Sequence, residues 1–401
     1  MQSFAEALDA ILAAAPVAGI EEVPRALAAG RVVARDPRVP RDVPASRLAA
    51  VDGFALGPET GPSWRVVATI PAGRSPVASL TAGEAAAVMT GGLVPAGAER
   101  VVRVEDCRED GATVRVAHAG PEGPLINETA AEAAAGDPLL EPGTRLDATR
   151  YPVLCAAGVQ RVEVFRTPRL GVLVTGGEVV DGCDGSDRLA PGLVFDANGA
   201  IVSSLAAAVG VPVARLLRVD DTPAALAAAV ADLAADCQVI VTTGGISRGR
   251  FDLVPDVLRD AGFRALVDGI RMRPGRPLRA ARRSDVIWLG LPGYPAACYT
   301  GALLLLVPLL KAASGRRDAA ARPIRARLAT PLHGRSERLD WCRVGLEVRD
   351  GAWIARDPGT QRSSHFLNFA RVDGLAELPE TVDALPAGAA VDVVSTALEL
   401  T

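Results

Sequence analysis

Glycine-rich turns that follow β-branched runs are the clearest sign of chemistry in this sequence. One run ends in Thr175-Gly176-Gly177-Glu178, another in Gly244-Gly245-Ile246-Ser247, and a later one in Pro292-Gly293-Tyr294. Paired glycines let backbone N–H groups converge on an anion, and Ser or Thr hydroxyls add donors. A single turn of this kind is more simply a tight strand-to-helix connection, but three along one sheet edge favour a phosphate-type ligand.

Acidic residues belong to the same set of connections: Glu178, Asp220 and Asp252. Carboxylates beside an anion site repel the ligand unless a divalent cation lies between them. Mg²⁺ held by one or two carboxylates and by substrate phosphate is the usual solution. For any single acidic residue the alternative is a helix cap or a solvated charge. Asp221, which precedes Thr222-Pro223, is predicted to be such a turn-and-cap residue.

A stiff basic segment, Arg271-Met272-Arg273-Pro274-Gly275-Arg276-Pro277, presents three guanidinium groups. Rigid planar donors of this kind suit tetrahedral oxyanions. The three histidines form no evident triad with a serine or cysteine. His365, which follows two serines, is a candidate for ligand contact, whereas His118 and His333 are predicted to be surface residues.

A parallel sheet is needed to bring these residues together, and the sequence predicts one from about residue 168. There β-branched runs alternate with Ala- and Leu-rich helical stretches, the pattern of a sheet covered by helices on both faces. Helices are also predicted at 2–15, at 25–34 and, long and apolar, at about 295–313. Between about 36 and 145, and again beyond 322, short Val-rich runs separated by Pro and Gly predict small β elements.

The composition excludes several classes of protein. Among 401 residues, Lys and Arg number 43 and Asp and Glu 47, so there is no general positive field for nucleic acid or an anionic membrane. The six cysteines include no CxxC pair, which argues against a zinc module or a disulfide framework. No secretion signal is recognisable, and the longest apolar run, 302–310, is too short to span a bilayer. We therefore expect a cytoplasmic protein.

The order of the motifs resembles that of a known family, the molybdopterin molybdenumtransferases, which include MoeA and the E domain of gephyrin. Val51-Asp52-Gly53-Phe54-Ala55 resembles the family's Met-Asp-Gly-Tyr-Ala loop, and Met89-Thr90-Gly91-Gly92 resembles its Met-Thr-Gly-Ala segment. The glycine turns, the Asp220-Asp221 pair, segment 273–277 and Arg338-Leu339-Asp340 with Arg343 follow in the family's order. Each motif alone is weak, but their shared order over nearly the whole chain is specific.

The resemblance implies a multidomain α/β fold. Its parts would be an N-terminal helical and mixed domain of residues 1–45 and 141–167, an inserted β-rich lobe of residues 46–140, a central α/β/α molybdopterin-binding domain with a mostly parallel sheet at 168–320, and a C-terminal β-barrel at 321–401. It also implies a homodimer in which the active cleft combines the central domain of one subunit with the lobe of the other.

The resemblance further implies an enzyme that inserts molybdate into adenylylated molybdopterin, releases AMP and depends on a divalent metal, taken as Mg²⁺. Catalytic roles fall on Asp52, Thr90, Glu178, Asp220 and Asp252, and the metal would be bound by Glu178, Asp220 and Asp252. Substrate-binding roles fall on Thr175, Gly176, Gly244, Gly245, Ser247, Pro292 and Gly293, and the molybdate pocket would be lined by Arg273, Arg276, Arg343 and Ser364.

Several positions depart from the family's pattern. They are Arg273 and Arg276 in place of lysines, Gly269 in place of a third lysine, Ala297 in place of a serine, Thr129 in place of an arginine, and Glu132 in place of an aspartate. Loss of one oxyanion donor can lower a rate by roughly 10²–10³-fold. The alternative is therefore a catalytically weakened paralogue that binds molybdopterin or molybdenum cofactor and passes it to a partner, such as a molybdoenzyme or the adenylyltransferase of the preceding step.

Two further readings have less support in the sequence. A scaffold that only dimerises has no need of glycine turns beside acidic loops. The adenylyltransferase itself would need only the central domain, which would leave the flanking β modules unexplained.

Overall fold

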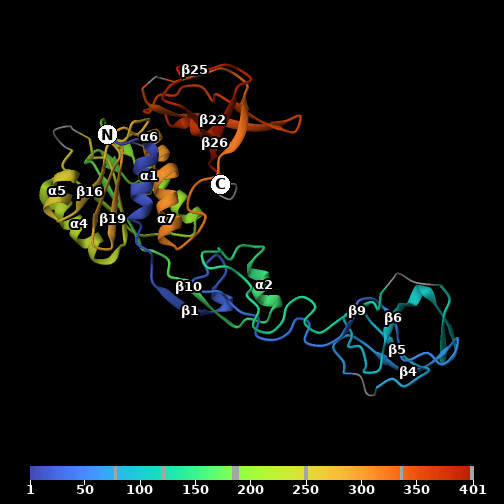
Figure 1. The fold of residues 1–401 in the computed structure, drawn as a ribbon. Coiled ribbons are helices and arrows are strands. Elements are labelled where there is room, and N and C mark those ends of the chain that lie inside the picture. The colour runs from blue at the N-terminus through green and yellow to red at the C-terminus, as the bar shows by residue number, and fades with distance from the viewer. Residues whose placement is uncertain (76–78, 119–122, 183–188, 248–251, 335–336, 398–401) are drawn as a thin grey trace.

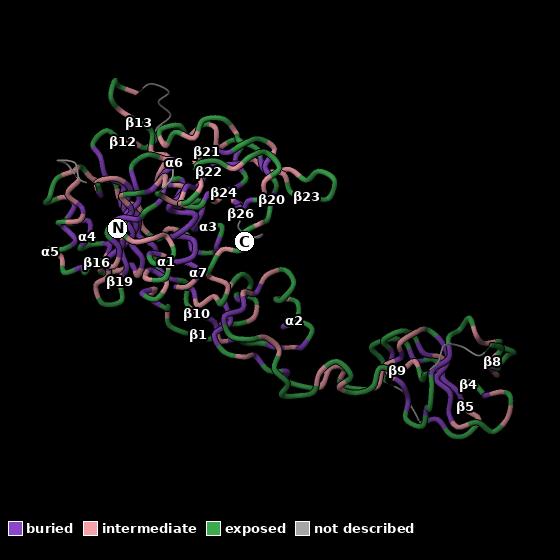
Figure 2. Tube along the Cα trace, turned by 45° about the horizontal axis from the view of Figure 1, so that its top comes forward, coloured by how far each residue is buried: buried purple, intermediate pink, exposed green. Residues whose placement is uncertain are grey.

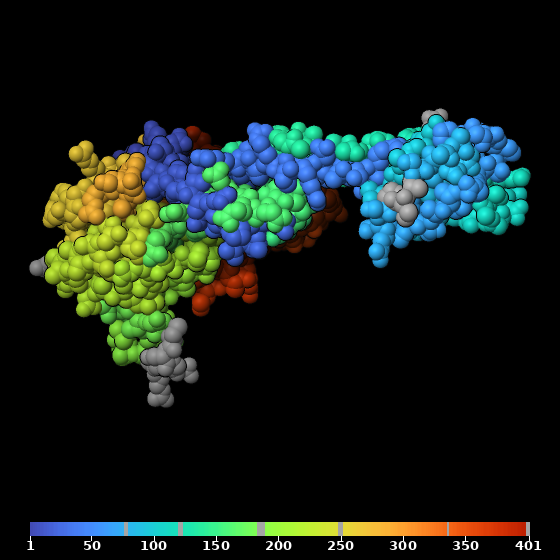
Figure 3. All heavy atoms as spheres, turned by 90° about the horizontal axis from the view of Figure 1, so that it is seen from below, coloured from blue at the N-terminus to red at the C-terminus, as the bar shows by residue number. Residues whose placement is uncertain are grey.

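A computed structural model of the 401-residue chain describes residues 1–75, 79–118, 123–182, 189–247, 252–334 and 337–397. The molecule is elongated: a central α/β domain and a C-terminal barrel lie together at one end, and a β lobe lies at the other (Figure 1). A narrow arm joins the two ends, which Figure 3 shows from another side. Of the six cysteines, Cys183 lies outside the described residues, and the other five are free thiols.

The central domain is built on a six-stranded sheet in the order β14-β11-β15-β19-β18-β16. Its strands are β11 (Leu170–Thr175), β14 (Val213–Val219), β15 (Val239–Thr243), β16 (Arg264–Asp268), β18 (Arg279–Arg283) and β19 (Val286–Leu291). The first four strands of that order are parallel, as predicted, whereas β18 and β16 add an antiparallel edge. The four parallel strands therefore end at the same edge of the sheet.

Helices cover both faces of this sheet because successive side chains of an inner strand point to opposite sides. Val172 of β11 shares a hydrophobic core with α3 (Ala197–Ala208). Leu173, the next residue, shares a different core with α4 (Pro223–Asp236) and α5 (Val254–Asp260). The predicted two-sided covering is confirmed.

The predicted long apolar helix is confirmed as Pro295–Ala313. It consists of α6 (Pro295–Gly301), the π-helical turn η4 (Ala302–Leu306) and α7 (Val307–Ala313). Pro308 lacks an N–H and its ring crowds the carbonyl four residues earlier, and the wider π turn lies where that crowding falls. The helix is long and apolar enough to cross a membrane, but it is 89% buried inside the protein and forms part of the central core.

The N-terminal helix is α1 (Phe4–Ala13), as predicted. The Ser3 hydroxyl accepts a hydrogen bond from the backbone N–H of Glu6, and the Glu6 carboxylate accepts one from the backbone N–H of Ser3. Ala7 and Ile11 are completely buried in the core of the central domain. Although it opens the chain, α1 therefore packs with the domain that begins more than a hundred residues later in the printed sequence.

The neck, between the arm and the central domain, is built from β1 (Ile20–Pro24), β10 (Arg161–Phe165) and α2 (Tyr151–Ala156). The helix predicted at 25–34 is wrong, because only η1 (Arg25–Leu27) forms a 3₁₀ turn. Val33 instead bridges to β10 and is fully buried, which suits a β-branched side chain.

The arm consists of two antiparallel segments, 37–43 and 133–139. Within it the N–H of Val39 donates to the carbonyl of Asp137 at 3.0 Å, and the N–H of Val43 donates to that of Ala133 at 2.8 Å. Most of the arm is exposed, and it leads to a lobe with a buried centre (Figure 2).

The lobe has a short pair, β2-β9, and a six-stranded sheet in the order β6-β3-β5-β4-β8-β7. Its strands are β2 (Leu48–Ala49), β3 (Gly53–Leu56), β4 (Trp64–Ile70), β5 (Glu84–Val88), β6 (Arg100–Arg103), β7 (Cys107–Asp110), β8 (Thr113–Val116) and β9 (Ile126–Asn127), with η2 (Val104–Asp106) after β6.

The C-terminal domain is a five-stranded barrel, as predicted. The sheet order β22-β23-β20-β26-β24 closes because β22 also pairs with β24. A sixth, short strand from the central domain, β17, runs parallel to β22 and ties the two domains together. The strands are β17 (Met272–Arg273), β20 (Ile324–Leu328), β22 (Leu339–Arg349), β23 (Ala352–Arg356), β24 (Gly374–Leu378) and β26 (Ala390–Ser395). Two small strand pairs lie outside the larger sheets: β12 (Val179–Val180) with β13 (Val194–Phe195), and β21 (Leu332–His333) with β25 (Ala384–Leu385). A 3₁₀ turn, η5 (Leu367–Arg371), precedes β24.

Candidate functional site

A cavity of about 780 Å³ opens at the sheet edge where β11, β14, β15 and β19 end. Its walls include all three glycine turns and one residue of the C-terminal domain. The predicted site residues that line it are Thr175, Glu178, Gly244, Gly245, Ser247, Asp252, Pro292, Gly293 and Ser364. We call this space the acidic cavity, because carboxylates are its charged lining residues.

The glycines of the turns are needed for their backbone shape and for close packing. Gly176, Gly244 and Gly245 have φ angles of +122°, +89° and +65°, a region that side chains rarely adopt. A Cβ on Gly245 would lie 2.9 Å from the Val254 side chain, and one on Gly176 would lie 2.7 Å from the Glu178 carboxylate. The turns therefore hold the backbone and Glu178 close against each other at the cavity wall.

The N-terminus of α3 also faces the acidic cavity and was missed in the sequence. Asp196 caps this helix by accepting a hydrogen bond from the N–H of Gly199 at 2.7 Å, and it pairs with Arg218 at 3.0 Å. Asn198 donates to the carbonyl of Gly293 at 2.8 Å and so ties α3 to the third glycine turn. The sequence signal was an N-cap aspartate before an apolar helical run. Backbone N–H groups at such a helix end favour an anion.

The acidic residues at the sheet edge lie partly as predicted. Glu178 and Asp252 line the cavity, but Asp221 lines it in place of Asp220. The prediction that Asp221 is a helix cap is wrong, because Thr222 caps α4 by accepting a hydrogen bond from the N–H of Ala225. Asp220 lies near the first turn, 3.5 Å from where a Cβ on Gly177 would be.

The pKa of Asp221 is raised by its surroundings. Burial raises the pKa of its carboxyl group, the negative charges of Glu178, Asp252 and Asp220 raise it further, and a hydrogen bond with Thr175 opposes the shift. Its Oδ1 atom is buried without a hydrogen-bond partner among the described residues. A buried carboxylate oxygen beside three other carboxylates is a position that a cation would stabilise.

The donor set fits Mg²⁺ of the kind that keeps part of its water shell. All candidate ligands are carboxylate oxygens, which suit a hard cation. Among the described residues, no group of three or more His, Cys, Asp or Glu side chains gathers closely enough to hold a metal by itself. One or two carboxylates together with ligand phosphate and water remain a sufficient set for Mg²⁺.

A second space, of about 450 Å³, adjoins the first and shares Pro277, Pro292 and Tyr294 with it. We call it the basic cavity, because four arginines and no described acidic residue line it: Arg273, Arg276, Arg338 and Arg362. Arg273, a predicted ligand, is already paired with Asp340 of the barrel at 2.8 Å, and the Asp340 side chain is only 2% exposed. Arg276 is exposed and forms no ion pair with an acidic side chain among the described residues.

Arg343, also predicted to line the oxyanion pocket, lines neither cavity. It is 3% exposed, and its guanidinium donates to the carbonyls of Thr360 at 2.6 Å and His365 at 3.0 Å. It also lies over the ring of Phe369, 5.3 Å from the centroid. Arg343 therefore holds the loop that carries Ser364 to the acidic cavity. His365 contributes its carbonyl to this contact and does not line either cavity, while His118 and His333 are exposed, as predicted.

Asp52 and Thr90 lie together on the lobe, at the far end of the arm from both cavities (Figure 1). The N–H and the hydroxyl of Thr90 donate to Oδ1 of Asp52 at 2.6 and 2.7 Å, and these two hydrogen bonds lower the pKa of that carboxyl group. Gly53 is required beside it, since a Cβ there would lie 1.9 Å from the carbonyl oxygen of Val102. Both side chains are exposed and preformed, but they do not meet the other predicted site residues within one chain.

The chain matches three family models in succession. The MoeA N-terminal region (domain I and II) matches residues 2–158, a probable molybdopterin binding domain matches residues 171–312, and the MoeA C-terminal region (domain IV) matches residues 325–396. The molybdopterin molybdenumtransferase of a Nostoc species is 30% identical over 364 residues, which cover 87% of this chain and 83% of the relative. That of Synechococcus elongatus is 29% identical over 406 residues, 98% of both chains.

Solved structures agree with these matches. Two crystal structures of the molybdopterin biosynthesis MoeA protein from Pyrococcus horikoshii have a TM-score of 0.80 with this chain and cover 98% of it, at 30% and 22% identity. The chain therefore belongs to the MoeA family of molybdopterin molybdenumtransferases, a family of molybdenum cofactor biosynthesis.

Proposed function

We propose that the protein is an active, cytoplasmic molybdopterin molybdenumtransferase, which inserts molybdate into adenylylated molybdopterin and releases AMP. The observation that carries this proposal is the pair of adjoining cavities with opposite charge, which share Pro277, Pro292 and Tyr294. A nucleotide pyrophosphate that needs a cation and a small dianion that needs arginines can bind side by side in such a pair.

The acidic cavity is assigned to the adenylylated substrate. The glycine turns and the end of α3 supply N–H groups to the pyrophosphate, and Asn198 keeps α3 against the third turn. Mg²⁺ would be held by one or two of the carboxylates of Glu178, Asp221 and Asp252, together with ligand phosphate and water, with Asp220 of the sequence prediction next to them. When bound there, the ion supplies charge neutralisation and polarisation of the phosphoryl oxygen.

The basic cavity is assigned to molybdate. Arg276, Arg338 and Arg362 supply donors to the tetrahedral oxyanion. Arg273 keeps the β17 segment against the barrel through Asp340, so its role is to fix the shape of the pocket. Arg343 acts in the same way on the loop of Ser364.

AMP release by the purified protein tests this function. Turnover of adenylylated molybdopterin is expected to require both Mg²⁺ and molybdate, and neither alone should support it. Binding of the substrate without AMP release under any metal condition would reject the assignment.

A homodimer would bring Asp52 and Thr90 of one subunit to the cavities of the other. This rests on the distance between the lobe and the cavities within one chain (Figure 1). Asp52→Asn removes the lobe carboxylate and Glu178→Gln removes one from the cavity, so each variant alone should be inactive. After random subunit exchange, half of the dimers are mixed and each has one intact site, so about a quarter of wild-type activity should return. No recovery would mean that each site is built within one subunit.

A catalytically weakened paralogue that binds and hands on molybdopterin or the finished cofactor is the second candidate. Specific observations favour it: Ala297 lines the basic cavity without a hydroxyl, Gly269 has no side chain, and Arg273 is committed to Asp340. For this candidate, calorimetry should detect pterin binding while no AMP appears. Complementation of a strain that lacks the transferase would reject it.

A further inference from the structure

A small polar cavity of about 30 Å³ lies where the neck meets the central domain, away from both larger cavities. Its neck side is formed by residues 30–32, 145 and 165–167, and its central side by residues 209, 210, 314 and 316. The packing around it is tight: a Cβ on Gly315 would lie 2.4 Å from the ring of Phe165. The cavity exceeds the roughly 10–15 Å³ that one water molecule needs.

Positive charge gathers around this space, and ion pairs with carboxylates of the described residues involve only part of it. Four arginines line it: Arg31, Arg145, Arg166 and Arg316. Glu21 pairs with the first of these and Asp318 with the last. Lys311, the only lysine of the chain, is 1% exposed close by. Burial lowers its pKa, and the charges of Arg316, Arg145 and Arg322 lower it further, while Asp318 opposes them.

Two of the donors at this junction are buried and unused. The Nε atoms of Arg31 and Arg145 have no hydrogen-bond partner among the described residues. A guanidinium cannot lose its proton in a protein, so the cost of an unused buried donor persists unless an acceptor enters the cavity. These two Nε–H groups therefore need an acceptor, and the positive charge around them favours an anion over water.

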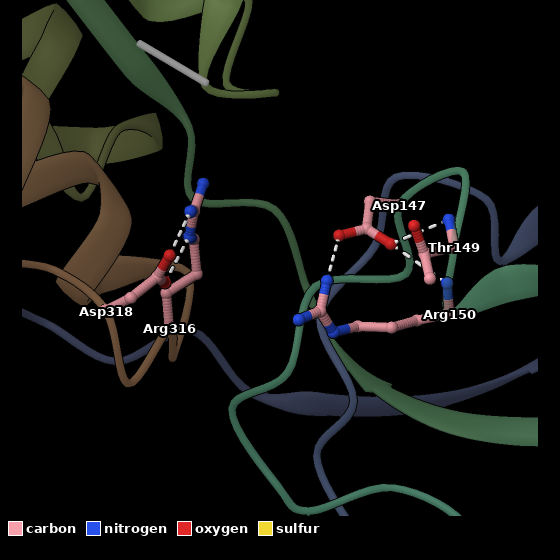
Figure 4. Close-up of polar contacts among 5 residues, drawn as sticks. All are labelled: Asp147, Thr149, Arg150, Arg316 and Asp318. Atoms are coloured by element: carbon pink, nitrogen blue, oxygen red, sulfur yellow. Dashed lines mark hydrogen bonds and ion pairs between the residues drawn. The ribbon is translucent and has the colours of Figure 1, made fainter. Parts of the chain in front are cut away.

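Two acidic side chains beside this junction have partners of their own (Figure 4). Asp318 makes a two-pronged ion pair with Arg316 on the central-domain side of the junction. Asp147, on the neck side, accepts hydrogen bonds from the backbone N–H groups of Thr149 and Arg150 and from the Arg150 guanidinium. Glu21 pairs with the Arg31 guanidinium through its terminal nitrogen, so all three carboxylates have partners other than the two unused Nε atoms.

We propose that this cavity binds a small inorganic anion, chloride, which braces the neck against the central domain. Chloride is only slightly larger than water, so it suits a cavity of about 30 Å³. Arg31 and Arg145 donate to it from the neck, and Arg316, which is held by Asp318, lines the opposite wall just beyond α7. By bridging the two sides, the anion stabilises the direction in which the arm leaves the central domain.

Crystals of the full chain soaked in bromide give a direct test, since bromide scatters anomalously and replaces chloride. An anomalous peak is expected inside the cavity, within hydrogen-bond reach of the Arg31 and Arg145 Nε atoms. A cavity that contains only water, or bromide confined to the protein surface, would overturn the proposal.

Thermal unfolding gives a test in solution. At constant ionic strength, replacement of gluconate by chloride should raise the Tm of the wild type by roughly 2–4 °C and saturate. Arg145→Gln removes one donor and its charge, so it should abolish the difference between the two salts. Arg166→Gln, at the exposed rim, should reduce it without endangering the fold.

Arg150→Gln is the matched control, because it removes a neighbouring arginine that pairs with Asp147 outside the cavity. It should keep the full response to chloride. If the wild type melts at the same temperature in both salts, or if both cavity variants respond as the wild type does, the cavity is not an anion site.

Discussion

The acidic and the basic cavity adjoin each other, yet they are assembled in different ways. The acidic cavity is made by residues close to the ends of consecutive parallel strands, and acidic residues are among those that line it. The basic cavity is made between two domains, and two of the arginines expected as its ligands serve as ties: Arg273 to Asp340, and Arg343 to loop carbonyls. Charged residues of one motif set thus line an open cavity in one place and hold two domains or a loop together in the other.

Removal of Arg273, which links the central domain to the barrel, should cause the largest loss of stability. Arg273→Gln leaves the Asp340 carboxylate, 2% exposed, without this ion pair. We expect a loss of about 3 kcal/mol in the free energy of unfolding, the low end for a broken buried pair, since the Arg273 side chain is itself 32% exposed. Urea denaturation measures this loss.

Arg276→Gln is the control for that comparison. Arg276 lines the same cavity but is exposed and forms no ion pair within the described part of the chain. Its replacement should therefore leave stability unchanged and raise the KM for molybdate by about tenfold, the loss of one charge-assisted hydrogen bond. Equal destabilisation by the two variants would contradict the proposal that Arg273 holds two domains together while Arg276 binds molybdate.

Replacement of a carboxylate in the acidic cavity should raise the stability of the metal-free protein, whereas replacement of Arg273 should lower it. Asp221→Asn is expected to lower kcat for AMP release by at least ~10²-fold, about 2.7 kcal/mol, because it removes a candidate metal ligand. The same change should stabilise the metal-free protein at neutral pH, since it relieves repulsion from Glu178, Asp252 and Asp220. Asp232→Asn, which breaks a surface pair with Arg215, should do neither.

The pH dependence of stability sharpens this prediction. The raised pKa of Asp221 means that the native state keeps this proton to a higher pH than the unfolded state does. Without metal, the wild type should therefore lose stability as pH rises from the ordinary aspartate range through the raised pKa, and should not regain it above. Asp221→Asn should lack this decline, and Mg²⁺ should offset it in the wild type only. A wild-type profile identical to that of the variant would contradict the predicted clustering of charge.

The Arg343 tie should be weaker than the first and should act through a loop. Arg343→Lys keeps the charge but replaces the two terminal nitrogens, which donate separately to the carbonyls of His365 and Thr360, by a single ammonium, and it removes the planar group that lies over Phe369. We expect a loss of roughly 2 kcal/mol in stability, the value of a hydrogen bond from a charged group, and faster proteolysis within residues 357–366. If Arg343 instead touched the oxyanion, the KM for molybdate would rise without any change in proteolysis.

The two cavities also differ in how far their residues could be predicted from the sequence. Alternating β-branched and helical runs predicted the parallel sheet, and strand ends carry the glycine turns to one edge by geometry alone. Whether Asp220 or Asp221 faces the cavity depends on a one-residue register after β14, which composition does not determine. The partner of Arg273 lies 67 positions away in another domain, and the carbonyls held by Arg343 carry no side-chain signal. The positions of cavity-lining residues near strand ends were therefore predictable, and long-range ties were not.

The smallest effect should come from a hydroxyl placed in the basic cavity. Ala297 lines that cavity and is 4% exposed, in the first turn of α6. Ala297→Ser adds one donor at the cost of little volume, so molybdate affinity should rise by about fivefold, the value of one neutral hydrogen bond of about 1 kcal/mol. Isothermal titration with molybdate measures this gain, and Ala296→Ser, equally buried but outside the lining, is the control. An unchanged affinity would mean that molybdate does not reach the α6 wall, and would place its contacts on the arginine side alone.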